Sequence, residues 1–377
     1  MQRTGRPESG RPESGVETYN LLVRRDDFHQ TALEAVRVGA LAPGQALLRI
    51  ERYALTANNV SYAASGEQLG FWKFFAAPEG WGRIPVWGFA EVVESVHPDL
   101  RVGERLFGYF PMSSHMVIDV AAPTAGTVSD GAPHRRDLPA VYNLYQRVTE
   151  PDESRRDLRA LVGPLFLLSF VLDDALKRRD DHHAAAVVLV SASSKTAIGL
   201  AYQFRRRRSP RLVGLTAAAN VDFVRSLGLY DRVLGYEDIA ALADVESAVS
   251  IDMAGNAGIL RRLHETLGDR LRQSILVGLT HWDGTPVPGA QSDLEATPLP
   301  GPAPWFFFGP DHIRDREREM GPDVYQHTVE QAMESFVSGS ASWLRVVHFD
   351  GADAALAAYR SILAGRTPPW EGVIVRP

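Results

Sequence analysis

Between residues 187 and 279 the chain alternates short, mostly apolar segments with segments of helical periodicity. The apolar segments lie at 187–190, 211–215, 248–253 and 274–279. Runs of four to six such residues are typical of strands that are covered on both faces, and helices between them return the chain for parallel pairing. The alternation therefore predicts right-handed βαβ units and a doubly wound parallel sheet, the α/β fold class.

The segments on either side of this region have a different pattern. From about residue 19 to residue 119, short alternating or β-branched runs are separated by turn signals, as at 46–54 and 89–96. Such spacing predicts a barrel-like β domain. Apolar periodicity predicts a helix over 155–177, and the chain ends with an expected helix at 352–363 and a strand at 372–375.

Composition limits the functions to be considered. The formal net charge of −6 gives no basic surface for nucleic acid, and no apolar run reaches the roughly 18–20 residues of a membrane-spanning helix. The absence of cysteine excludes disulfides, thiolate nucleophiles and cysteine-ligated zinc, and it fits a cytoplasmic location. A tandem GRPESG repeat lies within residues 1–18, which we expect to be a disordered tail.

Several segments, taken in order, resemble the medium-chain dehydrogenase/reductase superfamily, and within it the zinc-free quinone-reductase-like group. They are GQALLRIERYALTANNVSYAASG (44–66), IPVWGFAEVVES followed by RVGERLFGY, FVRSLGLYDRVLGYED (223–238) and the terminal EGVIVRP. The resemblance spans nearly the whole chain, which looks like a divergent branch. It implies a GroES-like catalytic domain over 19–139 and 346–377. It also implies a Rossmann nucleotide-binding domain over 140–345, with an insertion at about 281–304.

The segment after the first apolar strand is the expected cofactor loop. Related enzymes have roughly G-A-x-G-G-V-G where this chain has SASSKTA (191–197). Hydroxyls of Ser191, Ser193, Ser194 and Thr196, the charge of Lys195 and the free N–H groups of the following helix can still bind a phosphate. The alternative is an ordinary strand-to-helix turn with a serine or threonine cap. The surrounding order of elements favours dinucleotide binding.

The second strand bears on the choice between NAD and NADP. It ends at Thr216, where an acidic residue would bind the ribose 2′-hydroxyl of NAD. The absence of an acid leaves room for a 2′-phosphate, which Arg225 or the run 205–208 could reach. That run is also explained as a solvated helix end. We therefore expect NADP, with Gly278 of the later strand among the residues near the nicotinamide in the resemblance.

The resemblance also implies where the chemistry takes place. Zinc members have Gly-His-Glu where this chain has Trp87-Gly88-Phe89, and without histidine or cysteine ligands we expect no metal. Tyr53 and Asn58 lie in the segment that resembles the active-site strand and turn, and could stabilise a developing oxyanion. Core packing for the tyrosine and turn formation for the asparagine are the alternatives.

Two further candidates lie in loops. Lys73 sits within an aromatic segment, residues 67–89, that could build an apolar substrate pocket or a satellite core. This lysine could bind a substrate anion or act as an acid, although such side chains commonly extend to water. His281 follows the strand at 274–279 and is a candidate proton donor or a structural residue.

These residues lead to three functional hypotheses. The first is a zinc-independent, NADPH-dependent oxidoreductase that transfers hydride to a carbonyl or conjugated enone of a small apolar substrate. The second is a lyase or a carbon–carbon bond-cleaving enzyme on the same scaffold, and the third is a non-catalytic NADPH-binding protein. The aromatic strand at 303–310 resembles the edge strand that pairs related enzymes, so we expect a homodimer unless the chain covers this strand itself.

Overall fold

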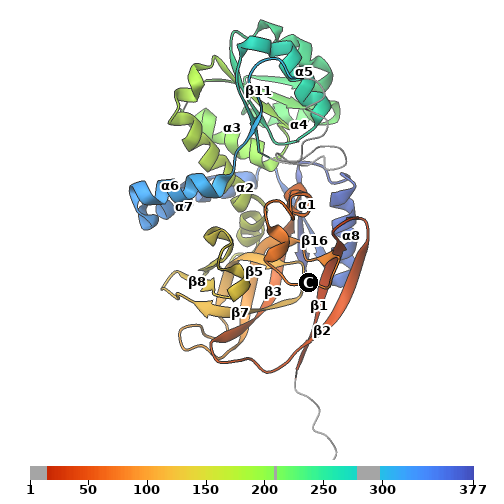
Figure 1. The fold of residues 1–377 in the computed structure, drawn as a ribbon, viewed down its shortest axis with the longest axis vertical. Coiled ribbons are helices and arrows are strands. Elements are labelled where there is room, and N and C mark those ends of the chain that lie inside the picture. The colour runs from red at the N-terminus through yellow and green to blue at the C-terminus, as the bar shows by residue number, and fades with distance from the viewer. Residues whose placement is uncertain (1–14, 208–209, 278–297) are drawn as a thin grey trace, which may run out of the picture.

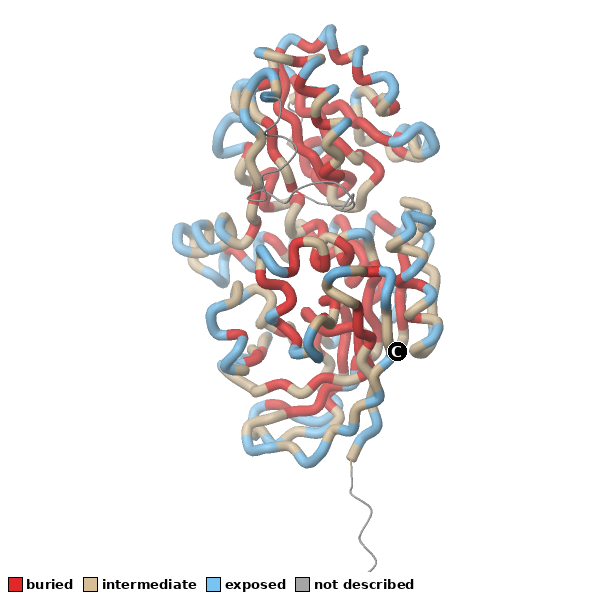
Figure 2. The backbone as a smooth tube through the Cα atoms, turned by 45° about the vertical axis from the view of Figure 1, so that its right-hand side comes forward, coloured by how far each residue is buried: buried red, intermediate tan, exposed pale blue. Residues whose placement is uncertain are grey.

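The computed structural model describes residues 15–207, 210–277 and 298–377. It forms two domains that are joined by the long helix α2 (Glu153–Lys177) (Figure 1). Figure 2 shows buried residues running along the strands in the middle of both domains, while the exposed residues lie on the outer helices and loops. Among the described residues, no helix is long and apolar enough to cross a membrane.

The nucleotide domain is built on a six-stranded sheet. Its strands are β10 (Ala186–Val190), β11 (Arg211–Thr216), β12 (Arg232–Gly235), β13 (Ala248–Asp252), β14 (Leu271–Leu276) and β15 (Trp305–Phe306). All pairs are parallel, and the spatial order β12-β11-β10-β13-β14-β15 is that of a Rossmann sheet. Helices α3 (Lys195–Arg207), α4 (Val221–Ser226) and α5 (Ala257–Leu267) connect the strands. The predicted doubly wound sheet is confirmed.

The other domain is a closed barrel. Six strands form it: β3 (Gln45–Leu55), β5 (Pro85–Ser95), β6 (Arg105–Pro111), β7 (His115–Ala121), β8 (Thr127–Asp130) and β9 (Leu144–Arg147). The pairing of β3 with β7 closes the ring. From β3 the sheet continues into β17 (Glu371–Arg376) and β16 (Arg345–Asp350), so the C-terminal segment returns to the barrel domain.

Smaller elements cover the barrel. Strands β1 (Val16–Arg24), β2 (Thr31–Val38) and β4 (Trp81–Gly82) form a separate three-stranded sheet. The helices are α1 (Ala57–Ala64), directly after β3, and α8 (Ala352–Leu363), which packs against β16 and β17. Tyr359 of α8 donates a hydrogen bond to the carbonyl of Phe28 at 2.9 Å, so α8 is fixed to the loop between β1 and β2.

The expected domain limits differ from the structure in two places. Strand β9 pairs with β6 and β8, so the barrel domain continues past the expected boundary at residue 140. Residues 16–18, assigned to the tail by their composition, begin strand β1, because Val16 pairs with Val38. The remainder of the expected tail, residues 1–14, lies outside the described residues.

Helices α6 (Gly309–Met320) and α7 (Pro322–Ser340) form a pair beside α2 (Figure 1). Helix α6, whose residues are mainly charged, was not predicted from the sequence. Both His312 and Arg316 of α6 contact the carboxylate of Asp174 on α2, at 2.7 and 2.9 Å. These contacts between α6 and α2 thus fix a helix that has little apolar surface.

Candidate active site

Helix α1 starts where β3 ends, and this turn positions the first group of site residues. The backbone N–H of Thr56 donates to Oδ1 of Asn59 at 2.7 Å, and Nδ2 of Asn59 donates to the carbonyl of Pro85 at 2.8 Å. Asn59 therefore binds the helix start to strand β5. The neighbouring side chains of Asn58 and Tyr62, from the same helix, line the space between the domains.

The loop after β10 is held by its own hydroxyls. Ser191 has φ +63°, a left-handed conformation in the place where related enzymes have glycine. Oγ of Ser194 accepts from the N–H of Ala197 at 3.2 Å, as a cap of helix α3. Oγ of Ser193 accepts from Thr216 at 3.1 Å and from Asn220 at 3.3 Å. The loop thus joins the ends of β10 and β11.

Lys195 connects this loop to the C-terminal segment. Its Nζ donates to the carbonyl oxygens of Glu371 at 2.9 Å and Pro369 at 3.4 Å. Burial lowers the pKa of Lys195 to about 8, and the nearby Glu371 opposes this effect. The lysine lines the cleft beside the loop, but its ammonium group is already engaged by carbonyl oxygens of the barrel domain.

A cleft of about 340 Å³ lies at the carboxyl ends of the parallel strands, which we call the nucleotide cleft. Its wall combines the loop 191–196, residues that follow the strands β13 and β14, helix α1 and the segment 362–371. It therefore opens where the strand order reverses between β10 and β13. Ligands of doubly wound sheets bind at such a switch point.

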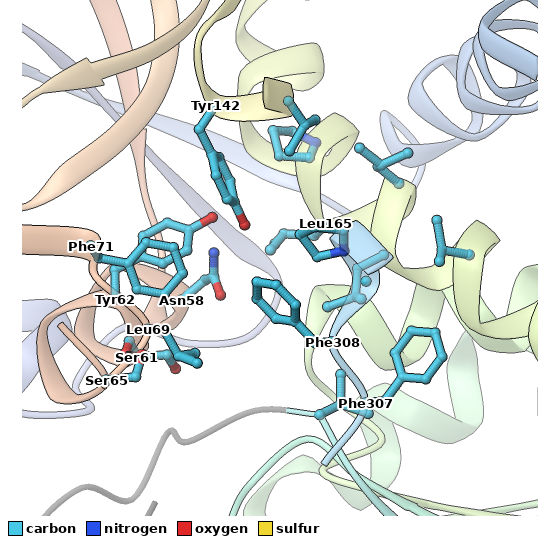
Figure 3. Close-up of a pocket in the computed structure, with 18 of the residues that line it drawn as sticks. Asn58, Ser61, Tyr62, Ser65, Leu69, Phe71, Tyr142, Leu165, Phe307 and Phe308 are labelled. Carbon is cyan, nitrogen blue, oxygen red and sulfur yellow. Dashed lines mark hydrogen bonds between the residues drawn. The ribbon is translucent and has the colours of Figure 1, made fainter. Parts of the chain in front are cut away.

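A second space, the aromatic pocket, adjoins the nucleotide cleft (Figure 3). It has a volume of about 120 Å³ and is lined by aromatic and aliphatic side chains with a few polar groups. Five residues line both spaces: Asn58, Ser61, Leu165, Leu168 and Val277. Figure 3 shows Asn58 and the hydroxyl of Tyr142 directed into the pocket opposite Leu165 and Phe308.

Aromatic side chains from distant segments build this pocket. The rings of Tyr62 and Phe71 are tilted against each other with centroids 4.7 Å apart, and the ring of Tyr142 is edge-on to that of Phe71 at 5.8 Å. Phe71 and Trp87 come from the segment 67–89, whose aromatic residues the sequence assigned either to a pocket or to a satellite core. Both outcomes occur, because other members of that segment, such as Phe74, are buried in the barrel core.

The structure brings together only some of the residues expected to be catalytic. Asn58 lies at the junction of the two spaces. Tyr53 is fully buried in β3 and Lys73 is exposed to solvent, and neither residue lines either space. His281 lies outside the described residues. Tyr142, which precedes β9 and lines the aromatic pocket, was not among the residues expected to be catalytic.

The residues expected to bind cofactor are also divided. Ser191, Ser193, Ser194, Lys195 and Thr196 all line the nucleotide cleft. Thr216 is only 1% exposed, behind Ser193, and the exposed Arg225 pairs with Asp222 on α4. Gly278 lies outside the described residues. Asn220 was missed, although its place shortly after the second strand marks it as a residue that can reach the cofactor's ribose.

Acidic and histidine side chains do not gather in either space. Over residues 15–207, 210–277 and 298–377, no group of three histidine, aspartate or glutamate residues is placed to hold a metal ion. The expectation of a metal-free site therefore stays a prediction, since His281 is not among these residues.

The closed barrel, the Rossmann sheet and the cleft between them define the fold of the medium-chain dehydrogenase/reductase superfamily, as the sequence resemblance implied. The chain belongs to the family whose description is "Protein of unknown function (DUF2855)", and the match covers residues 53–368. No curated protein matches the sequence.

Several solved structures, two of which are described as reductases, share this fold over almost their whole length. A Mesorhizobium loti protein, described as a candidate NADPH:quinone reductase, is 15% identical with a TM-score of 0.61, covering 98% of this chain and 100% of its own. CurA from Vibrio vulnificus in complex with NADPH is 16% identical with a TM-score of 0.59, covering 92% and 94%. A mutant enoyl thioester reductase from Candida tropicalis is 10% identical with a TM-score of 0.59, covering 96% and 100%.

Proposed function

We propose that this chain is a zinc-independent, NADPH-dependent oxidoreductase that transfers hydride to a carbonyl or conjugated enone of a small apolar substrate. The observation that carries the proposal is the shared wall of the nucleotide cleft and the aromatic pocket. A nicotinamide ring that reaches Asn58 and Val277 along the cleft would face a substrate in the pocket. The neighbouring fold of CurA, solved with NADPH, supports this choice of cofactor.

The residues of the cleft fit a dinucleotide phosphate. The first turn of α3 presents backbone N–H groups beside the hydroxyls of Ser194 and Thr196, which suits the pyrophosphate. At the end of β11 the cleft holds the amide of Asn220, and no acidic residue stands there to bind a ribose 2′-hydroxyl. We propose Asn220, with Arg225 on the next helix, as the residues that accept the 2′-phosphate of NADPH.

The aromatic pocket determines the substrate. Within residues 15–207, 210–277 and 298–377, the side chains that line it include no charged group, so among these residues an anionic substrate would lose its hydration without gaining a partner. The cofactor supplies the hydride when it is bound. The chain's own residues exclude water and hold the substrate, and the amide of Asn58 and the phenols of Tyr62 and Tyr142 offer hydrogen bonds to the oxygen on which charge develops.

The test is calorimetric titration of the purified protein with NADPH and, separately, NADH. We expect micromolar binding of NADPH and binding of NADH that is weaker by a factor of about 10 or more, which corresponds to about 1.4 kcal/mol. Asn220→Asp should reverse this preference, because its carboxylate repels a phosphate and can accept from a ribose hydroxyl. Failure of the wild type to bind either nucleotide refutes the proposal. Turnover of a carbonyl compound without nicotinamide would indicate a lyase instead.

We also propose a homodimer and a cytoplasmic location. In the part of the chain that the structure describes, strand β15 is the edge of the nucleotide sheet, and its two residues pair with β14 alone. A second copy paired at this edge would continue the sheet across both subunits. Light scattering after gel filtration should give twice the mass of the chain, and a monomer at micromolar concentration would contradict the assembly.

A further inference from the structure

The hydroxyl of Tyr62 is held in an unusual way. Tyr62 is only 8% exposed, and its side chain lines the aromatic pocket close to the nucleotide cleft. Nε1 of Trp87 donates a hydrogen bond to its Oη at 3.2 Å. The side chain of Asn58, from the same helix, also lowers the pKa of this hydroxyl.

The contact with Trp87 fixes the role of the phenolic oxygen. A phenol has one O–H donor and an oxygen that accepts, whereas an indole N–H can only donate. In the described part of the chain, the hydrogen bond of the Tyr62 hydroxyl is the one that its oxygen accepts from Trp87. Its own proton therefore has no protein acceptor among these residues and is available to a ligand in the pocket that Tyr62 lines.

The electrostatic setting suits transfer of that proton. Burial raises the pKa of Tyr62, so the phenol stays protonated near neutral pH, while Trp87 and Asn58 oppose the shift. The indole N–H of Trp87 would stabilise the phenolate after the proton has left. Because none of the described residues that line the pocket is charged, the hydrogen bond acts in surroundings of low polarity, where it is stronger than in water.

We propose that Tyr62 is the catalytic residue that donates a hydrogen bond and then its proton to the oxygen of an uncharged conjugated carbonyl substrate, with Trp87 and Asn58 as its positioning residues. The reduction itself rests on the proposed function, whereas the hydrogen bond to a carbonyl oxygen does not. In a zinc enzyme a metal would polarise this oxygen. Here Trp87, within the segment that resembles the zinc members' Gly-His-Glu, orients a phenol for the same task.

The reaction balances with one proton from Tyr62. The substrate gains a hydride, supplied by NADPH, at the carbon β to its carbonyl group. The electrons of the carbon–carbon double bond move toward the carbonyl oxygen, which accepts the proton from Oη of Tyr62 as the phenolic O–H bond breaks. The resulting enol becomes the saturated ketone, NADPH has been oxidised to NADP⁺, and Tyr62 regains a proton from water.

Tyr142 provides a matched control. It lines the same pocket, and its ring is edge-on to that of Tyr62 at 6.5 Å. Unlike Tyr62, its hydroxyl accepts no hydrogen bond from the residues that the structure describes. A phenol without such donors gains no stabilisation of its anion. Both Tyr62→Phe and Tyr142→Phe keep an aromatic ring of nearly the same size, so each variant should fold.

The experiment uses infrared spectroscopy of cyclohexenone labelled with carbon-13 at its carbonyl group, bound to the full chain without cofactor. We expect a carbonyl stretch at lower frequency than in an apolar solvent for the wild type and Tyr142→Phe. The shift should be lost in Tyr62→Phe and reduced in Trp87→Phe, which keeps a ring but removes the donor. A shift that persists in Tyr62→Phe, or no shift in the wild type, overturns the proposal.

Turnover gives the second readout. With NADPH and an enone, Tyr62→Phe should lose at least about 100-fold in kcat/KM while its affinity for NADPH is unchanged. Equal losses in Tyr62→Phe and Tyr142→Phe would contradict a special role for Tyr62. The infrared measurement needs no cofactor, so failure of NADPH to bind would refute the proposed function without removing the test of Tyr62.

Discussion

Arg135 is a cation almost without solvent contact, at 1% exposure, in the barrel domain. Its Nε is 3.2 Å from the carboxylate of Asp130 and also donates to the carbonyl of Phe74 at 3.2 Å. Nη1 donates to the hydroxyl of Tyr145 at 3.1 Å. The guanidinium group lies 4.8 Å from the ring centroid of Phe75. One side chain therefore connects a buried acid with the aromatic core behind the candidate site.

Arg135→Met should destabilise the protein by about 3–5 kcal/mol, the usual cost of removing one partner from a buried ion pair. The substitution preserves much of the side-chain volume, so the loss comes mainly from Asp130, which is 5% exposed and would keep its charge without a counterion. This is a large part of the 5–15 kcal/mol that stabilises a typical domain. The measurement is urea unfolding followed by tryptophan fluorescence.

The double variant Asp130→Asn/Arg135→Met is the control, and it should recover at least about 1 kcal/mol because no buried charge remains. The cost of Arg135→Met should also depend on pH. Burial raises the pKa of Asp130, and Arg135 opposes this shift. Without Arg135 the folded state binds the proton more tightly than the unfolded state, so the variant loses stability as pH rises through the folded pKa. A loss of stability in Arg135→Met below about 1 kcal/mol near pH 7 would refute this reasoning. So would a loss near pH 4.5 that equals the loss near pH 7.

Two substitutions in the cofactor loop test other features. Ser191→Gly should raise the free energy of unfolding by up to about 1 kcal/mol, because a backbone φ of +63° strains a residue with a side chain but not glycine. Urea unfolding measures this change, and a loss of stability would contradict the prediction. Lys195→Met should change how stability depends on pH. Burial lowers the folded pKa of Lys195 to about 8, below the ordinary 10.5, so the unfolded state binds the proton more tightly between these values. The wild type should therefore gain stability relative to Lys195→Met as pH rises across that interval, and parallel pH profiles would rule out this role of burial.

Local patterns predicted the nucleotide domain because its strands are buried along their length and its helices carry regular apolar faces. They did not predict α6, since its contacts with Asp174 come from a distant helix. The local patterns also could not predict the direction in which the side chain of Tyr53 points. The register of β3 shifts against β5 between Ile50 and Arg52, and such an irregularity changes which side chains face inward. Tyr53 then points into the core and not into the cleft.

The sequence was sufficient to predict the cofactor loop of the candidate site but not its aromatic pocket. Ser191–Thr196 follow a recognisable strand, and their place in the cleft depends only on the fold class. Asn220 reaches Ser193 because β10 and β11 pair in a particular register, which the sequence does not reveal. Trp87 and Tyr62 are far apart in the chain, and their hydrogen bond depends on how α1 is rotated against β5.

Helix α2 supplies Pro164, Leu165 and Leu168 to the wall of the aromatic pocket while it packs against α3, α7 and the barrel strands β3, β5 and β17. The packing leaves no room at Gly372, where a Cβ atom would lie 2.5 Å from Leu161. A hybrid in which part of the nucleotide domain comes from another protein should therefore be joined after α2, within 178–185. This chain then keeps the wall of the aromatic pocket that α2 supplies. Exchange of the segment from β10 to β13 alone would alter the choice of coenzyme and leave the residues of the aromatic pocket with the original chain. The two preferences can then diverge separately during evolution.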